Sequence, residues 1–199
     1  MADPALQRLT VDGFFDWCAR NDDTRWELID GCPVAMVPAS RRHMRVVSKL
    51  VRHIDQALDD KWPCASETGA GIVPPDRNNT FYEADLAVTC DPTDVGERCI
   101  TPNPILIVEA LSPSTKTKDF EKKLPDYKTI PSVREILLID STRMYADVYR
   151  RSGDDWDRIP LSDPDARLRL ESVGLDIPLG EVYATLSIKP GPAAIRRQV

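Results

Sequence analysis

The run Ile105–Leu111, with the sequence ILIVEAL, constrains the fold more than any other stretch of this chain. A strand of almost continuous apolar side chains is buried on both faces, so other layers must cover it on each side. The segment Arg134–Asp140, REILLID, predicts a second buried strand. Helices supply such layers in mixed α/β proteins, and 199 residues suffice for one domain of this kind. We expect the domain to span residues 1–190 and residues 191–199 to form a flexible tail.

Turn and capping residues predict the elements that surround these two strands. Thr10 can cap a helix that extends to about Arg20. Asp30-Gly31 is a strong turn pair between WELI and CPVA, which predicts a hairpin. A second hairpin is expected to turn at Ser152–Asp155, and one or two strands with a helical turn near Leu179–Val182 should follow it. Short strands around Cys64–Ser66 and Gly71–Val73, and a further strand containing YEADLAV, complete the prediction.

A long amphipathic helix is predicted from about Arg41 to Lys61. Its apolar residues recur at helical spacing and define the core side: Val47, Leu50, Val51, Ile54 and Leu58. Four cations fall together on the opposite side, at about 100° per residue: Arg41, Arg45, Lys49 and Arg52. Such a face either contacts the phosphate backbone of DNA or is merely solvated. The net charge of −6 decides nothing here, since binding depends on the local patch.

Two carboxylates stand in strands where apolar side chains are the rule. Asp85 lies within YEADLAV, and Glu109 follows the apolar run ILIV. A half-buried carboxylate needs a positive charge or a metal ion. If the two strands are neighbours, both acids can share one divalent cation, and Mg²⁺ favours a site of one or two carboxylates completed by water and phosphate oxygens. Mg²⁺ or Mn²⁺ in such a site supports hydrolysis of phosphodiesters, with the backbone carbonyl of Ala110 as a third ligand.

A lysine near such a site would stabilise the charge that develops on the phosphate. The segment from about Lys118 to Ile130 predicts a helix whose inward side is Phe120, Leu124 and Tyr127. Lys123 lies beside this inward stripe, whereas Lys122 points outward. Pro125 removes one hydrogen bond, so the helix must kink or begin anew there.

The motifs WELIDG, PASRRH, EADLAV, VEALSPST and DFEKKLPDY, followed by VREILLID, occur in an order and spacing that resemble the Uma-two family. This family is assigned to the restriction-like endonucleases of the PD-(D/E)XK nuclease superfamily. The resemblance runs from about Leu9 to Arg150. It implies a restriction-endonuclease-like α/β core with a mixed central sheet flanked by helices, to which this chain adds β-hairpins.

The resemblance also implies roles for individual residues. The aspartate of the family motif corresponds to Asp85 and the glutamate to Glu109, while EAD replaces the usual Pro-Asp pair. The signature lysine of the superfamily would stand at Leu111, but in this family it corresponds to Lys123 on the following helix. Glu27 matches an acidic residue contributed by the first layer. Tyr127 matches a recurrent helix tyrosine.

Each of these residues also has an ordinary structural explanation. Asp85 can be a strand-end carboxylate held by backbone amides or a lysine. Lys123 can extend its amine to solvent or pair with Asp119. Glu27 can pair across the hairpin. Glu67 in SETGAG and His43 are additional site candidates, although Glu67 also suits a loop and His43 is too far from His53 in the sequence to share a helical face with it.

The remaining features restrict the class of protein. The chain begins without an export signal and has no apolar run of the roughly 20 residues needed to cross a membrane. Its five cysteines are scattered, which predicts reduced thiols in the cytoplasm and no disulfide framework. We therefore expect a cytoplasmic, metal-dependent DNA endonuclease, and a homodimer, since cutting a duplex takes two cleavages. The alternatives are a non-catalytic DNA- or protein-binding member of the same fold and a glycosidase, which the 7% aromatic content does not favour.

Overall fold

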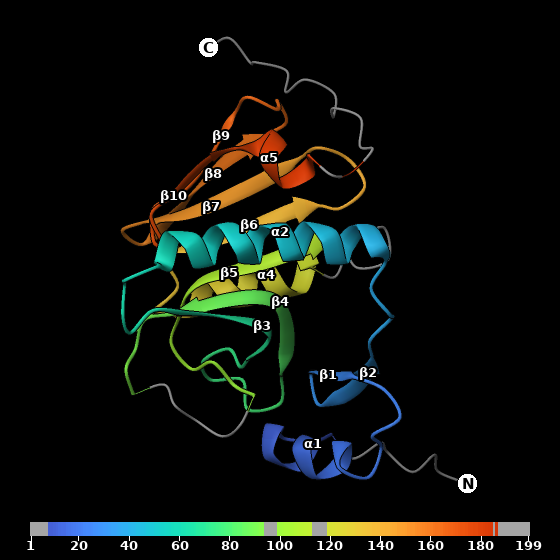
Figure 1. The fold of residues 1–199 in the computed structure, drawn as a ribbon. Helices are drawn as coiled ribbons and strands as arrows, with labels where there is room; N and C mark the ends of the chain where they lie inside the picture. Colours follow the sequence, from blue (N-terminus) through green and yellow to red (C-terminus); the bar gives the residue numbers. More distant parts are fainter. Residues whose placement is uncertain (1–7, 94–98, 113–118, 185, 187–199) are drawn as a thin grey trace, which may run out of the picture.

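A six-stranded sheet forms the centre of the domain (Figure 1). In spatial order its strands are β3 (Ala65–Ile72), β4 (Tyr82–Thr89), β5 (Pro104–Leu111), β6 (Glu135–Asp140), β7 (Ala146–Ser152) and β8 (Asp155–Leu161). Strands β5 and β6 are parallel and the other neighbours are antiparallel. This computed structural model describes residues 8–93, 99–112, 119–184 and 186. The expected mixed α/β fold is confirmed.

Strand β3 corrects one detail of the prediction. The two short strands expected around Cys64–Ser66 and Gly71–Val73 are one continuous strand. Thr68 pairs with Leu86 and Ala70 pairs with Ala84, so the register with β4 is the same on both sides of Gly69. Gly69 itself has a φ of 65°, which a residue without a Cβ adopts at little cost, and the strand therefore continues through this point.

Helix α2 (Arg41–Leu58) covers one face of the sheet (Figure 1). The Ser40 hydroxyl accepts the His43 N–H at 3.2 Å and caps its first turn. The buried positions repeat every four residues: Val46, Leu50, Ile54 and Leu58. Val46 was not predicted, and Val47 and Val51 are only partly buried, because the core side is centred closer to Val46 than the apolar pattern alone indicates. The helix ends at Leu58 rather than Lys61, and Asp60 has a φ of 63°, outside the helical region.

The opposite face of the sheet is covered by the π-helical segment η1 (Asp119–Lys123) and helix α4 (Leu124–Thr129). Leu124 and Tyr127 are buried against the sheet, as predicted. The expected single helix over Lys118–Ile130 is therefore two segments, and Lys118 lies outside the described residues. Because Pro125 lacks an N–H group, it fits only the first turn of a helix, and α4 begins there.

The N-terminal layer consists of α1 (Val11–Cys18) and the hairpin of β1 (Trp26–Ile29) and β2 (Cys32–Ala35). Thr10 accepts the Gly13 N–H at 3.2 Å, which confirms the predicted cap. The hairpin turns at Asp30 and Gly31, whose φ angles of 51° and 82° match the predicted tight turn. A Cβ on Gly31 would lie 2.6 Å from the Arg8 Cβ, so this position requires glycine. Leu28 bridges to Phe81 and joins the hairpin to the central sheet.

The C-terminal part of the domain packs beside α2. It contains β9 (Arg167–Leu170), β10 (Leu175–Pro178) and α5 (Leu179–Tyr183), which extend the core on the α2 side of the sheet. The predicted second hairpin, β7–β8, turns at Gly153. The tail expected over residues 191–199 lies outside the described residues. Within the described part of the chain, no helix is long and apolar enough to cross a membrane.

The cysteines do not all behave as expected. Cys64 and Cys90 form a disulfide, so the prediction of five reduced thiols is wrong for this pair. The register of β3 and β4 explains the bond: Ala65 pairs with Thr89, which leaves Cys64 opposite Cys90 just beyond the strand ends. Cys18, Cys32 and Cys99 are free thiols.

Candidate active site

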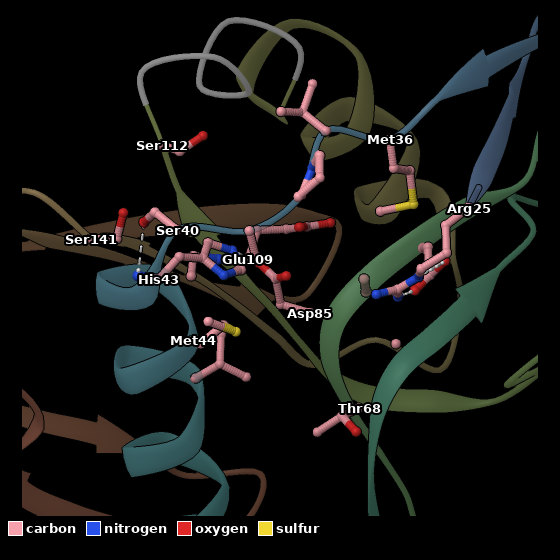
Figure 2. A pocket seen from close by; sticks show the side chains of 18 of the residues that line it. Arg25, Met36, Ser40, His43, Met44, Thr68, Asp85, Glu109, Ser112 and Ser141 are labelled. Atoms are coloured by element: carbon pink, nitrogen blue, oxygen red, sulfur yellow. Dashed lines mark hydrogen bonds and ion pairs between the residues drawn. The ribbon is translucent and has the colours of Figure 1, made fainter. Parts of the chain in front are cut away.

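A cavity of about 1460 Å³ opens between the start of α2, the segment that follows β2, and the adjoining parts of β4 and β5 (Figure 2). We call it the central cavity. Its lining includes all four residues predicted to be catalytic, the predicted backbone ligand and one additional candidate: Glu27, Asp85, Glu109, Lys123, Ala110 and His43. Residues from distant parts of the sequence therefore meet at one concave surface.

The two strand carboxylates come from corresponding positions of neighbouring strands. Leu86 on β4 pairs with Val108 on β5, so Asp85 and Glu109 are the next residues along this antiparallel ladder. The Ala110 N–H donates to Asp85 Oδ2 at 2.7 Å, which ties the Asp85 carboxylate to the end of β5. Figure 2 shows Asp85 and Glu109 beside one another in the cavity. This is the convergence that the sequence pattern predicts.

Lys123 and Tyr127 both contact the carboxylate of Glu109. Lys123 Nζ lies 2.9 Å from Glu109 Oε1, and the Tyr127 hydroxyl donates to the same oxygen at 2.6 Å. Glu109 is only 3% exposed, so the cation of Lys123 offsets the cost of burying its charge. Tyr127 has no exposed surface and packs against the sheet, which fixes the direction of its hydroxyl.

Lys123 joins two acidic side chains. Its Nζ lies 2.9 Å from Glu27 Oε1, as well as 2.9 Å from Glu109, and donates to the Glu83 carbonyl at 3.3 Å. Glu27 also accepts the Glu83 N–H at 3.0 Å. In the hairpin Glu27 is paired with Val34, so its ionic partner is Lys123 on η1 rather than a cation across the hairpin. The Asp119 side chain, the alternative partner of Lys123, lies outside the described residues.

His43 contacts the other carboxylate. Its Nε2 lies 3.0 Å from Asp85 Oδ2, and the side chains of His43 and Asp85 are 14% and 23% exposed. The spacing of His43 to Val46 and Leu50 places it on the core side of α2. This spacing is the sequence signal that could have placed His43 among the main site candidates. Asp85 is therefore held by a histidine and a backbone amide.

Glu67 and the four cations of α2 lie away from the carboxylates. Glu67 stands on β3 rather than in a loop, accepts a hydrogen bond from the Thr101 hydroxyl, and does not line the central cavity. Together with Met44 and Ser48, the four cations line a separate, shallower depression of about 490 Å³: Arg41, Arg45, Lys49 and Arg52. The structure thus confirms that they share one face, whereas contact with DNA stays a prediction.

Sequence patterns did not predict the wall that faces the carboxylates. The chain after β2 supplies apolar side chains to the cavity, among them Met36, Val37 and Pro38, and α2 adds Met44. Val37 is 72% exposed and Met44 is 52% exposed, which is unusual for large apolar side chains. A segment without periodicity carries no sequence signal for such a wall. Its position follows only from the path of the chain between β2 and α2.

The donor set suits a hard cation with few protein ligands. Among the residues that the structure describes, no group of three or more His, Cys, Asp or Glu side chains could hold a metal ion. Two carboxylates, Asp85 and Glu109, and the backbone of Ala110 line the cavity together. Mg²⁺ binds through one or two carboxylates and keeps several waters, so this set fits Mg²⁺ or Mn²⁺ and does not fit a metal that needs several histidines or thiolates.

A mixed sheet with helices on both faces, and acids meeting at β4 and β5, defines a domain of the restriction-endonuclease-like class. The chain belongs to the Uma2 family: the family model described as "Putative restriction endonuclease" matches residues 11–180.

Two relatives come from Synechocystis sp. The uncharacterized protein slr1290 is 30% identical over 185 residues, which is 90% of this chain and 94% of that protein. The uncharacterized protein sll1609 is 29% identical over 130 residues, 64% of this chain and 73% of that protein. Neither name states an activity.

A solved structure shares the fold. It is described as "a putative nuclease belonging to DUF820 from Anabaena variabilis", and it superposes with a TM-score of 0.72 at 18% sequence identity. The match covers 88% of this chain and 98% of the other. At this identity the likeness concerns the arrangement of helices and strands.

Proposed function

We propose that this protein is a metal-dependent endonuclease that hydrolyses phosphodiester bonds of DNA. One observation carries the proposal: Asp85 and Glu109, at corresponding positions of β4 and β5, line one cavity with a lysine held 2.9 Å from Glu109. Membership of a family of nucleases supports the general class. The fold, shared with a solved structure, is consistent with the same class.

Asp85, Glu109 and the backbone carbonyl of Ala110 would hold Mg²⁺ or Mn²⁺. When bound, the metal lowers the pKa of a water molecule and neutralises the charge that develops on the phosphate. Hydrogen bonds within the protein hold the two carboxylate ligands in place. The Ala110 N–H and His43 contact Asp85, and Tyr127 and Lys123 contact Glu109. Ligands held in place in this way lose little entropy when the cation binds.

The remaining polar side chains act on the attacking water and on the phosphate. Lys123 can donate N–H bonds to the water that attacks phosphorus and to a phosphate oxygen, because an ammonium group has three donors. Glu27 holds Nζ in place at 2.9 Å and assists the same water through a bridging water molecule. The new bond forms between the water oxygen and phosphorus, and the bond from phosphorus to the leaving sugar oxygen breaks. The attacking water releases a proton to solvent, and the leaving sugar oxygen takes up a proton from a solvent water.

The direct test is cleavage of supercoiled plasmid DNA with Mg²⁺ or Mn²⁺ by the wild type and by Asp85→Asn. We expect metal-dependent nicking by the wild type and at least a hundredfold slower nicking by the variant, on the order of the loss of a main electrostatic contributor. Asp23→Asn is the matched control, because Asp23 is exposed and does not line the central cavity. Equal nicking by wild type and Asp85→Asn rejects the proposed site.

One observation favours the alternative, a non-catalytic DNA- or protein-binding member of the family. His43 Nε2 already lies 3.0 Å from Asp85, and Lys123 Nζ lies 2.9 Å from Glu109, so both acids already have partners within the protein. A chain that folds normally and binds no divalent cation, as measured by titration calorimetry, would support this alternative.

A homodimer and a cytoplasmic location stay predictions. Two cuts are needed to break a duplex, and a dimer places two sites on one substrate. DNA is the substrate in this proposal.

A further inference from the structure

One side of α2 carries a row of cations that do not line the central cavity. We call it the basic face of α2 and define it by four residues: Arg41, Arg45, Lys49 and Arg52. The three arginines are exposed, and Lys49 is half-buried. They recur at intervals of four, four and three residues, which keeps them on one side of the helix.

Among the described residues, the ion pairs of the protein leave the charge of this face without an acidic partner. Within the described ranges, no acidic side chain forms an ion pair with any of the four. The acidic residue of α2, Asp55, accepts a hydrogen bond from the Ser66 hydroxyl. The whole chain has a net charge of −6, so a row of four cations is a local exception to its overall charge. Four like charges close together repel one another, and a polyanion would relieve this repulsion.

The basic face continues into the central cavity. Met44 and Ser48 line both the depression beside the four cations and the central cavity. One turn of the same helix presents His43 to Asp85 at 3.0 Å. Figure 2 shows His43 and Met44 on the part of α2 that borders the cavity. A polymer lying along the basic face therefore reaches the edge of the carboxylate site without crossing another element.

The dimensions of the face suit a regular polyanion. At a rise of 1.5 Å per residue, Arg41 and Arg52 are about 17 Å apart along the helix axis. One strand of B-DNA carries a phosphate every 3.4 Å of its axis, so this length corresponds to about five phosphates. Flexible arginine and lysine side chains at about 6 Å intervals can neutralise several of them.

We propose that the basic face of α2 binds the sugar-phosphate backbone of duplex DNA and directs it to the central cavity. This inference rests on the proposed function, since it names the surface that holds the substrate of that site. The contacts are to phosphates, so they fix the position of the DNA and carry no sequence information. Binding through this face is independent of sequence and falls steeply with salt.

The experiment measures binding without cleavage. Fluorescence anisotropy of a labelled 24-base-pair duplex is recorded in EDTA at increasing KCl concentration, for the wild type and for Arg45→Gln/Lys49→Gln. Each lost phosphate contact reduces the slope of log affinity against log salt by about 1, so the double variant should lose about 2 in slope. The control is Arg20→Gln/Arg134→Gln, which removes the same charge from two exposed arginines that lie outside α2, in connecting segments, and should leave the slope unchanged.

Two results would overturn the inference. One is a face variant that binds DNA with the affinity and slope of the wild type; the other is equal competition by polyglutamate, which would assign the face to acidic polypeptides. The thermal unfolding of each variant shows that its fold is intact. Binding is measured in EDTA, so it does not depend on cleavage. If the face variant binds DNA more weakly than the wild type, the inference is supported even when the wild type cleaves no DNA. Absence of cleavage would then overturn the proposed function alone.

Discussion

Two neighbouring clusters in this protein use almost the same chemistry. In the lysine cluster a cation, Lys123, lies between Glu27 and Glu109, and Tyr127 donates to Glu109 at 2.6 Å. In the arginine cluster a cation, Arg77, lies between Asp30 and Asp126, and Tyr82 donates to Asp126 at 2.7 Å. Each cluster therefore combines two carboxylates, a central cation and one tyrosine hydroxyl, and Lys122 Nζ also lies 3.7 Å from Asp30 in the arginine cluster.

The clusters differ in access and in the kind of cation. Three members of the lysine cluster line the central cavity, namely Glu27, Glu109 and Lys123, whereas no member of the arginine cluster does. Arg77 Nη1 lies 2.7 Å from both oxygens of Asp126, and the planar guanidinium is a permanent, directional partner. An ammonium group is a compact charge whose donors can turn toward a substrate. We infer that the first cluster serves chemistry and the second serves stability.

The surroundings of Tyr82 show how firmly the arginine cluster is built. Burial first, and then the hydrogen bond to Asp126, raise the pKa of Tyr82 above its ordinary value. The ring of Tyr82 lies edge-on to Tyr127 at 5.8 Å and 5.8 Å from Lys123 Nζ, so the two clusters are in contact through this ring. Their contributions can still be measured separately, because the two tyrosine hydroxyls donate to different carboxylates, Tyr127 to Glu109 and Tyr82 to Asp126.

The largest expected effect is on cleavage by Glu109→Gln. This change removes the charge of a proposed metal ligand while it keeps the size of the side chain, and we expect cleavage to fall on the order of a thousandfold. Plasmid nicking at saturating Mg²⁺ measures it. Glu121→Gln is the matched control, because Glu121 is exposed on η1 and does not line the central cavity. Comparable nicking by Glu109→Gln and Glu121→Gln would remove the distinction between the two clusters.

The arginine cluster should affect stability instead. Arg77→Met leaves the carboxylate of Asp126 buried without its cation, and we expect a loss of about 2–3 kcal/mol in the free energy of unfolding. For a chain of this size that corresponds to a fall in Tm of about 5–10 °C. Arg77→Lys should lose less, because the charge stays while the forked hydrogen bonds go. Calorimetry measures both variants, and a Tm unchanged in Arg77→Met would show that the arginine cluster contributes no stability.

The two tyrosines give the sharpest matched pair. Tyr127→Phe removes the hydroxyl that positions Glu109, so cleavage should slow by about tenfold, and the loss of this buried hydrogen bond should also lower the free energy of unfolding by about 1 kcal/mol. Tyr82→Phe removes the equivalent hydroxyl from Asp126, so the free energy of unfolding should fall by about 1 kcal/mol while cleavage stays the same. Both quantities are measured for both variants, and cleavage is the one in which they should differ. The reverse pattern of cleavage would mean that the roles of the clusters have been exchanged.

The smallest expected effect concerns Asp140, a buried carboxylate that belongs to neither cluster. Burial alone would raise the pKa of Asp140, but hydrogen bonds from Thr142 and Arg143 outweigh it and lower that pKa below its ordinary value. A lowered pKa stabilises the fold above about pH 4, and this contribution is lost as the pH falls through the lowered value. Asp140→Asn should therefore cost about 0.5–1 kcal/mol at pH 7 and flatten the acid limb of the stability profile. Urea unfolding from pH 7 to pH 3 measures this limb; a limb as steep as that of the wild type would contradict the assignment.

Much of the site follows from local rules. Consecutive strands joined by one loop pair in antiparallel fashion, so the sequence predicts that Asp85 and Glu109 meet. The helical wheel places Lys123 beside the inward stripe of Leu124 and Tyr127, and Pro125 explains why the helix begins anew. These predictions depend on the direction of successive side chains, which repeats every two residues in a strand and every 3.6 residues in a helix.

Other features depend on registers that no local rule fixes. Cys64 and Cys90 are joined only because β3 and β4 pair with Ala65 opposite Thr89. The same register directs Glu67 to Thr101, away from the carboxylates. The path of Met36 and Val37 along the cavity follows from the connection between β2 and α2, which has no repeating pattern.

The most direct test of the central claim is a titration with Mn²⁺, followed by electron paramagnetic resonance, on the wild type, Asp85→Asn and Glu109→Gln. If the two strand carboxylates hold one hard cation together, the wild type binds one Mn²⁺ that Mg²⁺ displaces, and each variant binds it at least about tenfold more weakly. Equal Mn²⁺ affinity in all three proteins, or none in any of them, would contradict the claim.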